Sequence, residues 1–352
     1  MNTPTFVVGT GRCGSTMLSN MLREHPEILS LSEFFSMITD GDQTHEPFSL
    51  DPVDGPRFWS ILAATGSYYS FMLRHGLEFQ EILYPASDPS ARFSAETGVP
   101  GILLTSLPHL TSEHDALFDR LAGELPAWPE APMRDHYLRL FGWLADHFGK
   151  HQWVERSGAL RYVAPLSQMF PDARFVHIVR DGRDAALSMQ KHNAWRLGLA
   201  WYAIEEFLGV HPLNSDDRAH ADRVPPGLSA FLPEQFDTAA FRKFEIPRQA
   251  CGGFWSTEIA AGLDLLRHIP SDRILTLRYE DFFIDPGHQL DTLARFVGEE
   301  FIDKDWSARC AATVRKPKST WRDLPDDEAS ALIKACSAGF ELLKAVGVNY
   351  DV

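Results

Sequence analysis

The hydrophobic and polar positions of the chain predict short buried strands that alternate with amphipathic helices. Apolar runs rich in β-branched residues begin at about residues 5, 28, 152, 174 and 274. Stretches with apolar residues at helical spacing follow these runs. The alternation is typical of a parallel sheet with helices on both faces. We therefore predict an α/β fold of three layers, with a central parallel sheet.

Two long stretches interrupt this alternation. Residues from about 40 to 150 read mainly as helices, and we interpret them as a helical insertion. Residues from about 195 to 250 begin with a helix and continue as a segment rich in Pro and Phe, which predicts either a lid over an acceptor or a mobile surface loop. Because the candidate site residues lie towards both ends of the chain, we expect a single domain over residues 1–352.

A glycine-rich turn follows the first strand and precedes the first helix. Its sequence is Gly9-Thr-Gly-Arg-Cys-Gly14-Ser-Thr. Glycines let the backbone turn tightly and expose its N–H groups at a helix N-terminus, which makes an anion site. The spacing of Gly9 and Gly14 matches a P-loop, but Ser15 takes the place of the usual lysine. We expect a P-loop NTPase-like fold that holds a phosphate or sulfate ester, with Arg12 as the cation. The alternative is a plain turn whose glycines serve packing.

Charged residues also follow the strands at about 28 and 174. Glu33 lies at the end of its strand, where flanking phenylalanines would raise its pKa, or it is an ordinary exposed loop residue. Arg180 ends the other strand, and Ser188 lies near the second turn of the next helix, so the two can close on one phosphate. The alternatives are an ion pair between Arg180 and Asp184, and a magnesium-binding role for Asp181.

Net charge, apolar runs and cysteine spacing limit the partners, the compartment and the metal sites that we expect. The net charge of −15 disfavours nucleic acid and anionic membranes as partners. The sequence has no apolar run long enough to span a membrane, and the first strand leaves no room for a signal peptide. Four widely spaced cysteines predict reduced thiols in a cytoplasmic protein. Because the sequence has no zinc-type spacing of Cys and His, we expect no metal.

Four segments together resemble a known family. They are GTGRCGST from Gly9, WVERSG from Trp153, FPDARFVHIVRDGRDAALSM from Phe170 and RILTLRYEDFFIDP from Arg273. This combination is similar to the sulfotransferases that use 3′-phosphoadenosine 5′-phosphosulfate (PAPS), particularly bacterial members and the tyrosylprotein type. The resemblance implies a transferase of P-loop-like fold that needs no metal. Its acceptor would be a hydroxyl group of a small molecule or peptide, and its product 3′,5′-bisphosphoadenosine.

The resemblance also implies roles for individual residues. Arg12 matches the residue that contacts the transferring sulfuryl group, and Glu33 matches the carboxylate base of the tyrosylprotein type. Arg180 and Ser188 match the pair that binds the 3′-phosphate, and Tyr279 matches a tyrosine that contacts the donor. The full set implied to bind the donor is Gly11, Arg12, Cys13, Gly14, Ser15, Thr16, Arg180, Ser188, Tyr279, Lys316 and Lys318.

The chain departs from the family at two of these segments. Arg156 stands where relatives usually have a lysine, which keeps the charge but reaches differently. Cys13 replaces a common serine, and a thiol at a helix N-terminus can have a lowered pKa. Two other functions stay open from the sequence: a metal-dependent kinase with an atypical P-loop, and a catalytically idle nucleotide-binding protein. His25 is an alternative base to Glu33.

Overall fold

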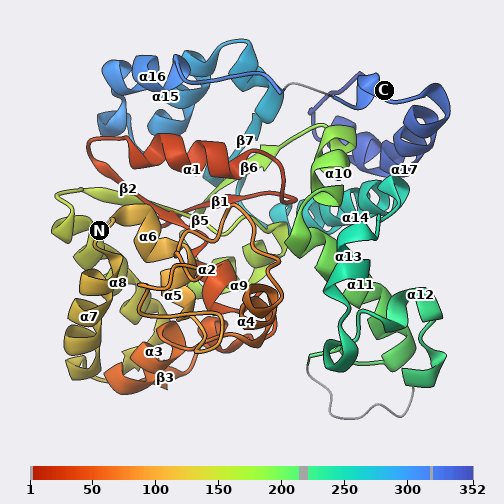
Figure 1. Ribbon diagram of the computed structural model, residues 1–352. Helices are drawn as coiled ribbons and strands as arrows, with labels where there is room; N and C mark the ends of the chain where they lie inside the picture. The colour runs from red at the N-terminus through yellow and green to blue at the C-terminus, as the bar shows by residue number, and fades with distance from the viewer. Residues whose placement is uncertain (1–2, 214–220, 318–319, 352) are drawn as a thin grey trace.

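A five-stranded parallel sheet forms the centre of the computed structural model, which describes residues 3–213, 221–317 and 320–351 (Figure 1). The strand order is β2-β5-β1-β6-β7. Their bounds are β1 Thr5–Val8, β5 Gln152–Arg156, β6 Arg174–Val179, β2 Ile28–Ser32 and β7 Ile274–Arg278. The five strands predicted from the apolar runs are therefore confirmed. β2 and β5 lie on one side of β1, and β6 and β7 lie on the other, so the strand order has a switch point at β1, where ligands of open α/β sheets bind.

The sheet has a separate hydrophobic core on each face, because successive side chains of a strand point to opposite sides. Val7 lies in one core and its neighbours Phe6 and Val8 lie in the other. The core that contains Val7 includes residues of α1 (Ser15–Arg23), α15 (Pro286–Val297) and α16 (Lys304–Ala311). The core that contains Phe6 includes residues of α8 (Met133–His147) and α9 (Val163–Met169). Two helical layers around one sheet confirm the predicted three-layer α/β fold (Figure 1).

The stretch predicted as a helical insertion, from about 40 to 150, contains six α-helices in the described chain. Their bounds are α3 Gly55–Leu62, α4 Ser67–Arg74, α5 Gly101–Leu104, α6 Ser106–Leu110, α7 His114–Glu124 and α8 Met133–His147, and α2 (Phe34–Ile38) precedes the stretch. A short antiparallel pair, β3 (Pro52–Val53) with β4 (Ala131–Pro132), was not predicted. Aromatic rings join the insertion to the sheet, with the ring centroid of Phe35 lying 6.3 Å from Phe6 and 5.1 Å from Tyr137.

The second half of the chain forms a helical region beside the sheet. Its helices are α10 Gly182–Gln190, α11 Asn193–Leu208, α12 Pro226–Ser229, α13 Thr238–Lys243, α14 Arg248–Leu266 and α17 Asp326–Ala345. In Figure 1, α11, α12 and α13 form a lobe at the lower right. The described part of the Pro- and Phe-rich segment therefore contains short helices, while residues 214–220 lie outside the description. No helix in the described ranges has the length and hydropathy to cross a membrane.

Close packing of three helices depends on two glycines that face one tryptophan. Trp255 of α14 is fully buried. Its indole ring lies where a Cβ atom would stand on Gly182 of α10 and on Gly339 of α17. Because neither glycine has a side chain, the backbones of α10 and α17 approach the ring closely. This contact fixes the position of α10. The predicted site residue Ser188 lies in this helix, and Arg180 lies two residues before its start.

Replacing Gly339 by alanine tests this packing. The added methyl group would overlap the Trp255 ring, so we expect Gly339→Ala to lower the free energy of unfolding by about 1–3 kcal/mol, measured by urea denaturation. Gly253→Ala in α14 is the matched control, because nothing lies within 4 Å of its added Cβ. That control should be neutral or stabilising by up to ~1 kcal/mol. Equal stability of the two variants would contradict the proposed close approach at Trp255.

Candidate active site

A cavity of about 1090 Å³ opens at the carboxyl ends of four neighbouring strands. The residues that follow or end these strands line it: Gly11 and Arg12 after β1, Glu33 after β2, Arg156 at the end of β5 and Arg180 after β6. The carboxyl ends of parallel strands meet at one edge of a sheet, which explains how residues so far apart in the sequence converge. Four of the predicted site residues, together with Arg156, are thus brought to one cavity.

The glycine-rich turn has the backbone conformation that its sequence predicts. Gly11 and Gly14 have positive φ angles of 74° and 95°, and Arg12 between them has φ 51°. Side chains rarely adopt this left-handed region, so two of the three positions need glycine. A Cβ atom on Gly11 would overlap the ring of Trp195, and one on Gly14 would overlap the ring of Tyr279. The two aromatic rings therefore lie directly against the turn.

Cys13 does not have the lowered pKa that its place near a helix N-terminus suggested. Its side chain is fully buried in the core beneath the turn, together with Val7 and Leu18. Burial raises the pKa of the thiol above its ordinary value, and this outweighs the hydrogen bonds from Ser15 that lower it. Cys13 is absent from the cavity lining, although it was predicted to bind the donor. None of the four cysteines, which are all buried, forms a disulfide.

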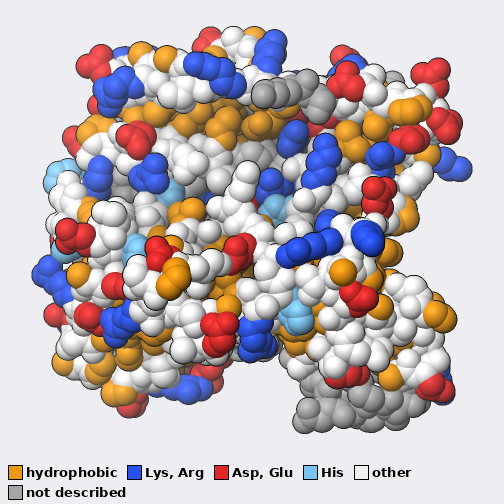
Figure 2. Space-filling view, viewed as in Figure 1, with side chains coloured by type: hydrophobic (Ala, Val, Ile, Leu, Met, Phe, Trp, Pro, Cys, Tyr) orange, Lys and Arg blue, Asp and Glu red, His pale blue; other side chains and the backbone are white. Residues whose placement is uncertain are grey.

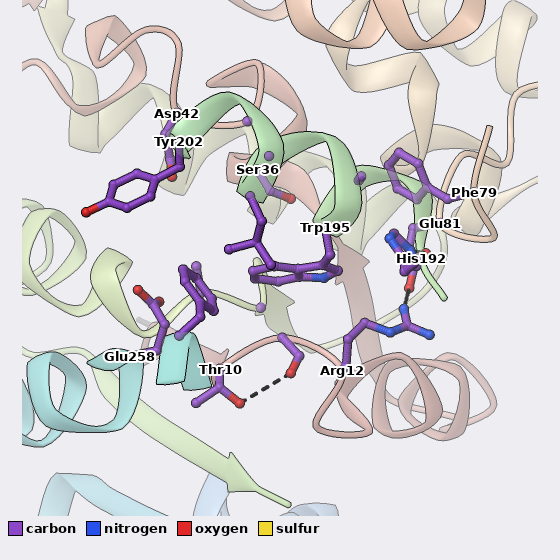
Figure 3. A pocket seen from close by; sticks show the side chains of 18 of the residues that line it. Thr10, Arg12, Ser36, Asp42, Phe79, Glu81, His192, Trp195, Tyr202 and Glu258 are labelled. Atoms are coloured by element: carbon purple, nitrogen blue, oxygen red, sulfur yellow. Dashed lines mark hydrogen bonds and ion pairs between the residues drawn. The ribbon is translucent and has the colours of Figure 1, made fainter. Parts of the chain in front are cut away.

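Arg12 lies in a buried network that the sequence did not predict in full (Figure 3). Its Nε donates to Ser188 Oγ at 3.1 Å, and its Nη1 pairs with Glu81 Oε1 at 2.6 Å. The other oxygen of Glu81 lies 3.0 Å from His192 Nε2, and Thr16 Oγ1 donates to Oε1 at 3.4 Å. Glu81 comes from the insertion, far from the turn in sequence, and no motif marks it. The fold alone brings it to the site.

Arg180 lies beside the same turn. Its Nη1 donates to the carbonyl oxygen of Arg12 at 3.0 Å, and its guanidinium lies 4.9 Å from the centre of the Tyr279 ring. The predicted pair Arg180 and Ser188 therefore converges on Arg12 from two sides. Asp181, by contrast, is engaged with its own helix, because it caps α10 and forms an ion pair with Arg183.

Glu33 lies at the cavity in a polar cluster and not in an exposed loop. Its side chain is 13 % exposed, and its carboxylate forms an ion pair with Arg156 and accepts a hydrogen bond from Ser36. Burial raises the pKa of Glu33 above its ordinary value, and the charge of Arg156 opposes this. The second guanidinium nitrogen of Arg156 donates to Ser32 Oγ at 3.0 Å. Arg156 is thereby fixed against the strand ends, with its charge turned towards Glu33.

A second carboxyl group, Glu155, is buried next to this pair. Its Oε1 accepts the backbone N–H of Phe34 at 3.1 Å and a hydrogen bond from Ser157, so it anchors the start of α2 just after Glu33. Complete burial raises the pKa of Glu155 to about 8, and the nearby charge of Glu33 adds to the increase. Glu155 is therefore mainly a neutral carboxylic acid at pH 7. The sequence did not point to it, because its side chain faces inwards.

Three other predicted residues are absent from the cavity lining, namely Ser188, the exposed Lys316 and His25. Lys318 lies outside the described residues. His25 is buried just beyond the C-terminal end of α1, where its Nε2 lies 2.9 Å from the carbonyl oxygen of Phe301. It is not among the residues that line the cavity, so the interpretation of His25 as an alternative base is wrong.

The cavity extends away from the turn towards α11 and α14. Asp42, Tyr202 and Glu258 line this end (Figure 3). Arg161 lies between the two carboxylates, 2.9 Å from Asp42 and 3.7 Å from Glu258. Residues of the predicted lid stretch also contribute to the wall, among them Trp195, Tyr202, Phe244 and Pro247. In Figure 2, Lys and Arg side chains gather near the middle of the face above the α11–α13 lobe.

Family models match most of the chain. A model described as "Sulfotransferase family" matches residues 4–236, and one described as "Sulfotransferase domain" matches residues 156–321. The first match alone spans more than half of the sequence and includes the turn, Glu33 and Arg180. A comparison with curated proteins found no match.

Solved structures with a similar arrangement come from several sources. The sulfotransferase domain of the Synechococcus PCC 7002 olefin synthase is 16% identical, with a TM-score of 0.41 over 100% of this chain and 97% of that one. Sulfotransferase STF9 from Mycobacterium avium is 17% identical, with a TM-score of 0.45 over 99% and 78% of the two chains. A retinol dehydratase in complex with androsterone and the inactive cofactor PAP is 13% identical, with a TM-score of 0.34 over 99% and 83%.

The raised pKa of Glu155 predicts a pH-dependent stability. Between the ordinary glutamate value of 4.5 and about 8, the folded protein holds a proton that the unfolded chain releases. The folded state therefore loses stability as pH rises through this window, by up to ~1.4 kcal/mol for each pH unit. Glu155→Gln should remove this loss, so its unfolding free energy relative to wild type should increase from pH 5 to pH 7 in urea titrations.

The exposed Glu24 offers a control for this prediction. The unfolding free energy of Glu24→Gln should change with pH in the same way as that of wild type, because the side chain of Glu24 is 64% exposed. A Glu155→Gln curve that also ran parallel to wild type would mean that Glu155 is ionised in the folded protein at pH 7.

Proposed function

Because the chain belongs to the sulfotransferase family, we propose that it transfers the sulfuryl group of PAPS to a hydroxyl group of a small molecule or peptide. One observation carries the proposal. Four parallel strand ends bring three arginines and a buried carboxylate to a single cavity, next to a glycine-rich turn at a helix N-terminus. A site of this kind suits an anionic donor and an acceptor that must lose a proton. The cavity volume of about 1090 Å³ leaves room for both substrates.

The turn and α10 would hold the two ends of the donor. Gly14 precedes α1 and has no side chain to cap it, so the first N–H groups of the helix can bind the 5′-phosphosulfate. Arg180 and Ser188 both contact Arg12 and would bind the 3′-phosphate. Ser188 accepts its hydrogen bond from Arg12, which leaves the hydroxyl proton of Ser188 available for a phosphate oxygen.

Arg12 and Arg156 would stabilise the charge that develops during transfer. Both side chains are held by neighbours before any ligand binds, Arg12 by Glu81 and Ser188, and Arg156 by Glu33 and Ser32. Donors fixed in advance need no reorganisation at the moment of reaction, which is the main source of electrostatic catalysis. The donor supplies the sulfuryl group, and the sulfur–oxygen bond to its 5′-phosphate breaks as the bond to the acceptor oxygen forms.

Glu33 would accept the proton of the acceptor hydroxyl. Its raised pKa makes it a stronger base than an exposed glutamate, and it lines the cavity. The acceptor would occupy the part of the cavity that Asp42, Tyr202 and Glu258 line. The stretch from about 195 to 250 would act as the lid over the acceptor, because several of its side chains already form part of the wall.

The first prediction of this proposal concerns the 3′-phosphate. Charge-assisted hydrogen bonds contribute about 1.5–3 kcal/mol each, so 3′,5′-bisphosphoadenosine should bind much more tightly than AMP. Arg180→Ala should remove most of this difference in isothermal titration calorimetry. Arg161→Ala is a matched control, because Arg161 lies at the other end of the same cavity and should leave the difference intact. Equal binding of AMP by the wild-type protein would refute the proposed donor.

The second prediction concerns Glu33. Glu33→Gln keeps the shape of the side chain and removes the proton acceptor, so turnover should fall by ~10²–10⁴. The affinity for 3′,5′-bisphosphoadenosine should change little, because a carboxylate offers no attraction to an anionic ligand. Both quantities are measured on one preparation, with PAPS and a library of hydroxylated acceptors followed by mass spectrometry. Near-normal turnover would remove Glu33 from the mechanism.

A further inference from the structure

Glu81 is a buried carboxylate inside a site that is proposed to bind anions. It is 8% exposed, and its two oxygens contact the glycine-rich turn and His192 at the start of α11. One oxygen contacts Arg12 Nη1 at 2.6 Å and Thr16 Oγ1 at 3.4 Å, and the other lies 3.0 Å from His192 Nε2. Figure 3 shows Arg12, Glu81 and His192 grouped at one side of the cavity. A negative charge here needs an explanation, because it would repel a bound anion.

The backbone around Glu81 is tied to α5, so the carboxylate has a fixed place. Thr105 Oγ1 donates to the carbonyl oxygen of Glu81 at 2.5 Å. The N–H groups of Leu83 and Tyr84 both donate to the carbonyl oxygen of Leu104, at 2.8 and 3.1 Å. The ring of Phe79 also packs against His192, with 4.9 Å between the ring centroids. Moving the carboxylate out of the site would disrupt these contacts.

The carboxylate is also permanently charged. Burial alone would raise the pKa of Glu81, but the hydrogen bond from His192 and the charge of Arg12 outweigh it and lower the pKa to about 2. A fixed negative charge therefore stands next to Arg12 and Thr16 at every pH at which the protein would work. Any ligand oxygen held by both of these residues lies close to Glu81, because both touch its carboxylate.

A terminal sulfate and a terminal phosphate would interact differently with the fixed carboxylate of Glu81. The terminal group of PAPS carries one negative charge, whereas a terminal phosphate carries nearly two at pH 8, since its second pKa is about 6. Each extra negative charge placed close to the Glu81 carboxylate costs binding energy. The attraction of Arg12 is already shared with Glu81, so it offsets less of that cost.

We infer that Glu81 is a specificity-determining residue, which makes the donor site select a terminal group with one negative charge and reject one with two. In this way a phosphosulfate is chosen over a diphosphate of the same shape. The inference rests on the proposed function, because it assumes that the donor's terminal group lies at Arg12. It assigns to the insertion a part in donor choice.

Three nucleotides separate charge from shape in the wild-type protein. They are PAPS, 3′-phosphoadenosine 5′-diphosphate, and the analogue of that diphosphate with fluorine on the terminal phosphorus, which has a single charge there. Titration calorimetry at pH 8 without acceptor should give similar affinities for PAPS and the fluorinated analogue. The plain diphosphate should bind at least about tenfold more weakly, which is ~1.4 kcal/mol. A fluorinated analogue that bound as weakly as the diphosphate would overturn the inference.

The variant Glu81→Gln then tests whether the discrimination comes from the charge of Glu81. The amide keeps a carbonyl oxygen for Arg12, so the diphosphate should gain at least about tenfold relative to PAPS. Glu81→Asp is the matched control, because it keeps the charge and should keep most of the discrimination. An unchanged ratio in Glu81→Gln would overturn the inference and leave the proposed function intact. Failure of the wild-type protein to bind any of the three nucleotides would overturn both.

Discussion

The structure depends on pairing buried charges at one edge of the sheet. A buried arginine needs a partner, because an uncompensated charge in a dry site is strongly destabilising. Arg156 forms an ion pair with Glu33, and Arg12 forms one with Glu81. The turn after β1 supplies a cation, but its partner comes from the insertion between β2 and β5. The insertion is therefore part of the site and does more than cover one face of the sheet.

This requirement also explains why the site spans so much of the chain. The sheet alone brings together the ends of β1, β2, β5 and β6. Aromatic rings from two later segments, Trp195 and Tyr279, then lie against Gly11 and Gly14. Since the turn has little side-chain volume of its own, these rings fill the space above its glycines and limit the ways in which it can move. A flexible sequence is thus held in one conformation by residues far away in the chain.

The sequence predicted what depends on local pattern. Apolar runs revealed all five strands of the main sheet, and the glycine spacing revealed the tight turn after β1, because both follow from steric limits within a few residues. Glu81, His192 and Glu155 were missed, since their roles depend on contacts between segments that only the fold defines. The short pair of β3 and β4 has too few residues to carry a pattern.

Arg156 shows how a residue that departs from the family motif can still supply a fixed positive charge at the site. A guanidinium has separate N–H edges, so Arg156 donates to Ser32 with one nitrogen and pairs with Glu33 through another. A lysine in this position would offer a single point of charge. Glu155 lies next to the pair, yet its pKa of about 8 keeps it mainly neutral, so it does not compete for the arginine. Of the two carboxyl groups beside Arg156, only Glu33 forms an ion pair with it, and only Glu33 lines the cavity.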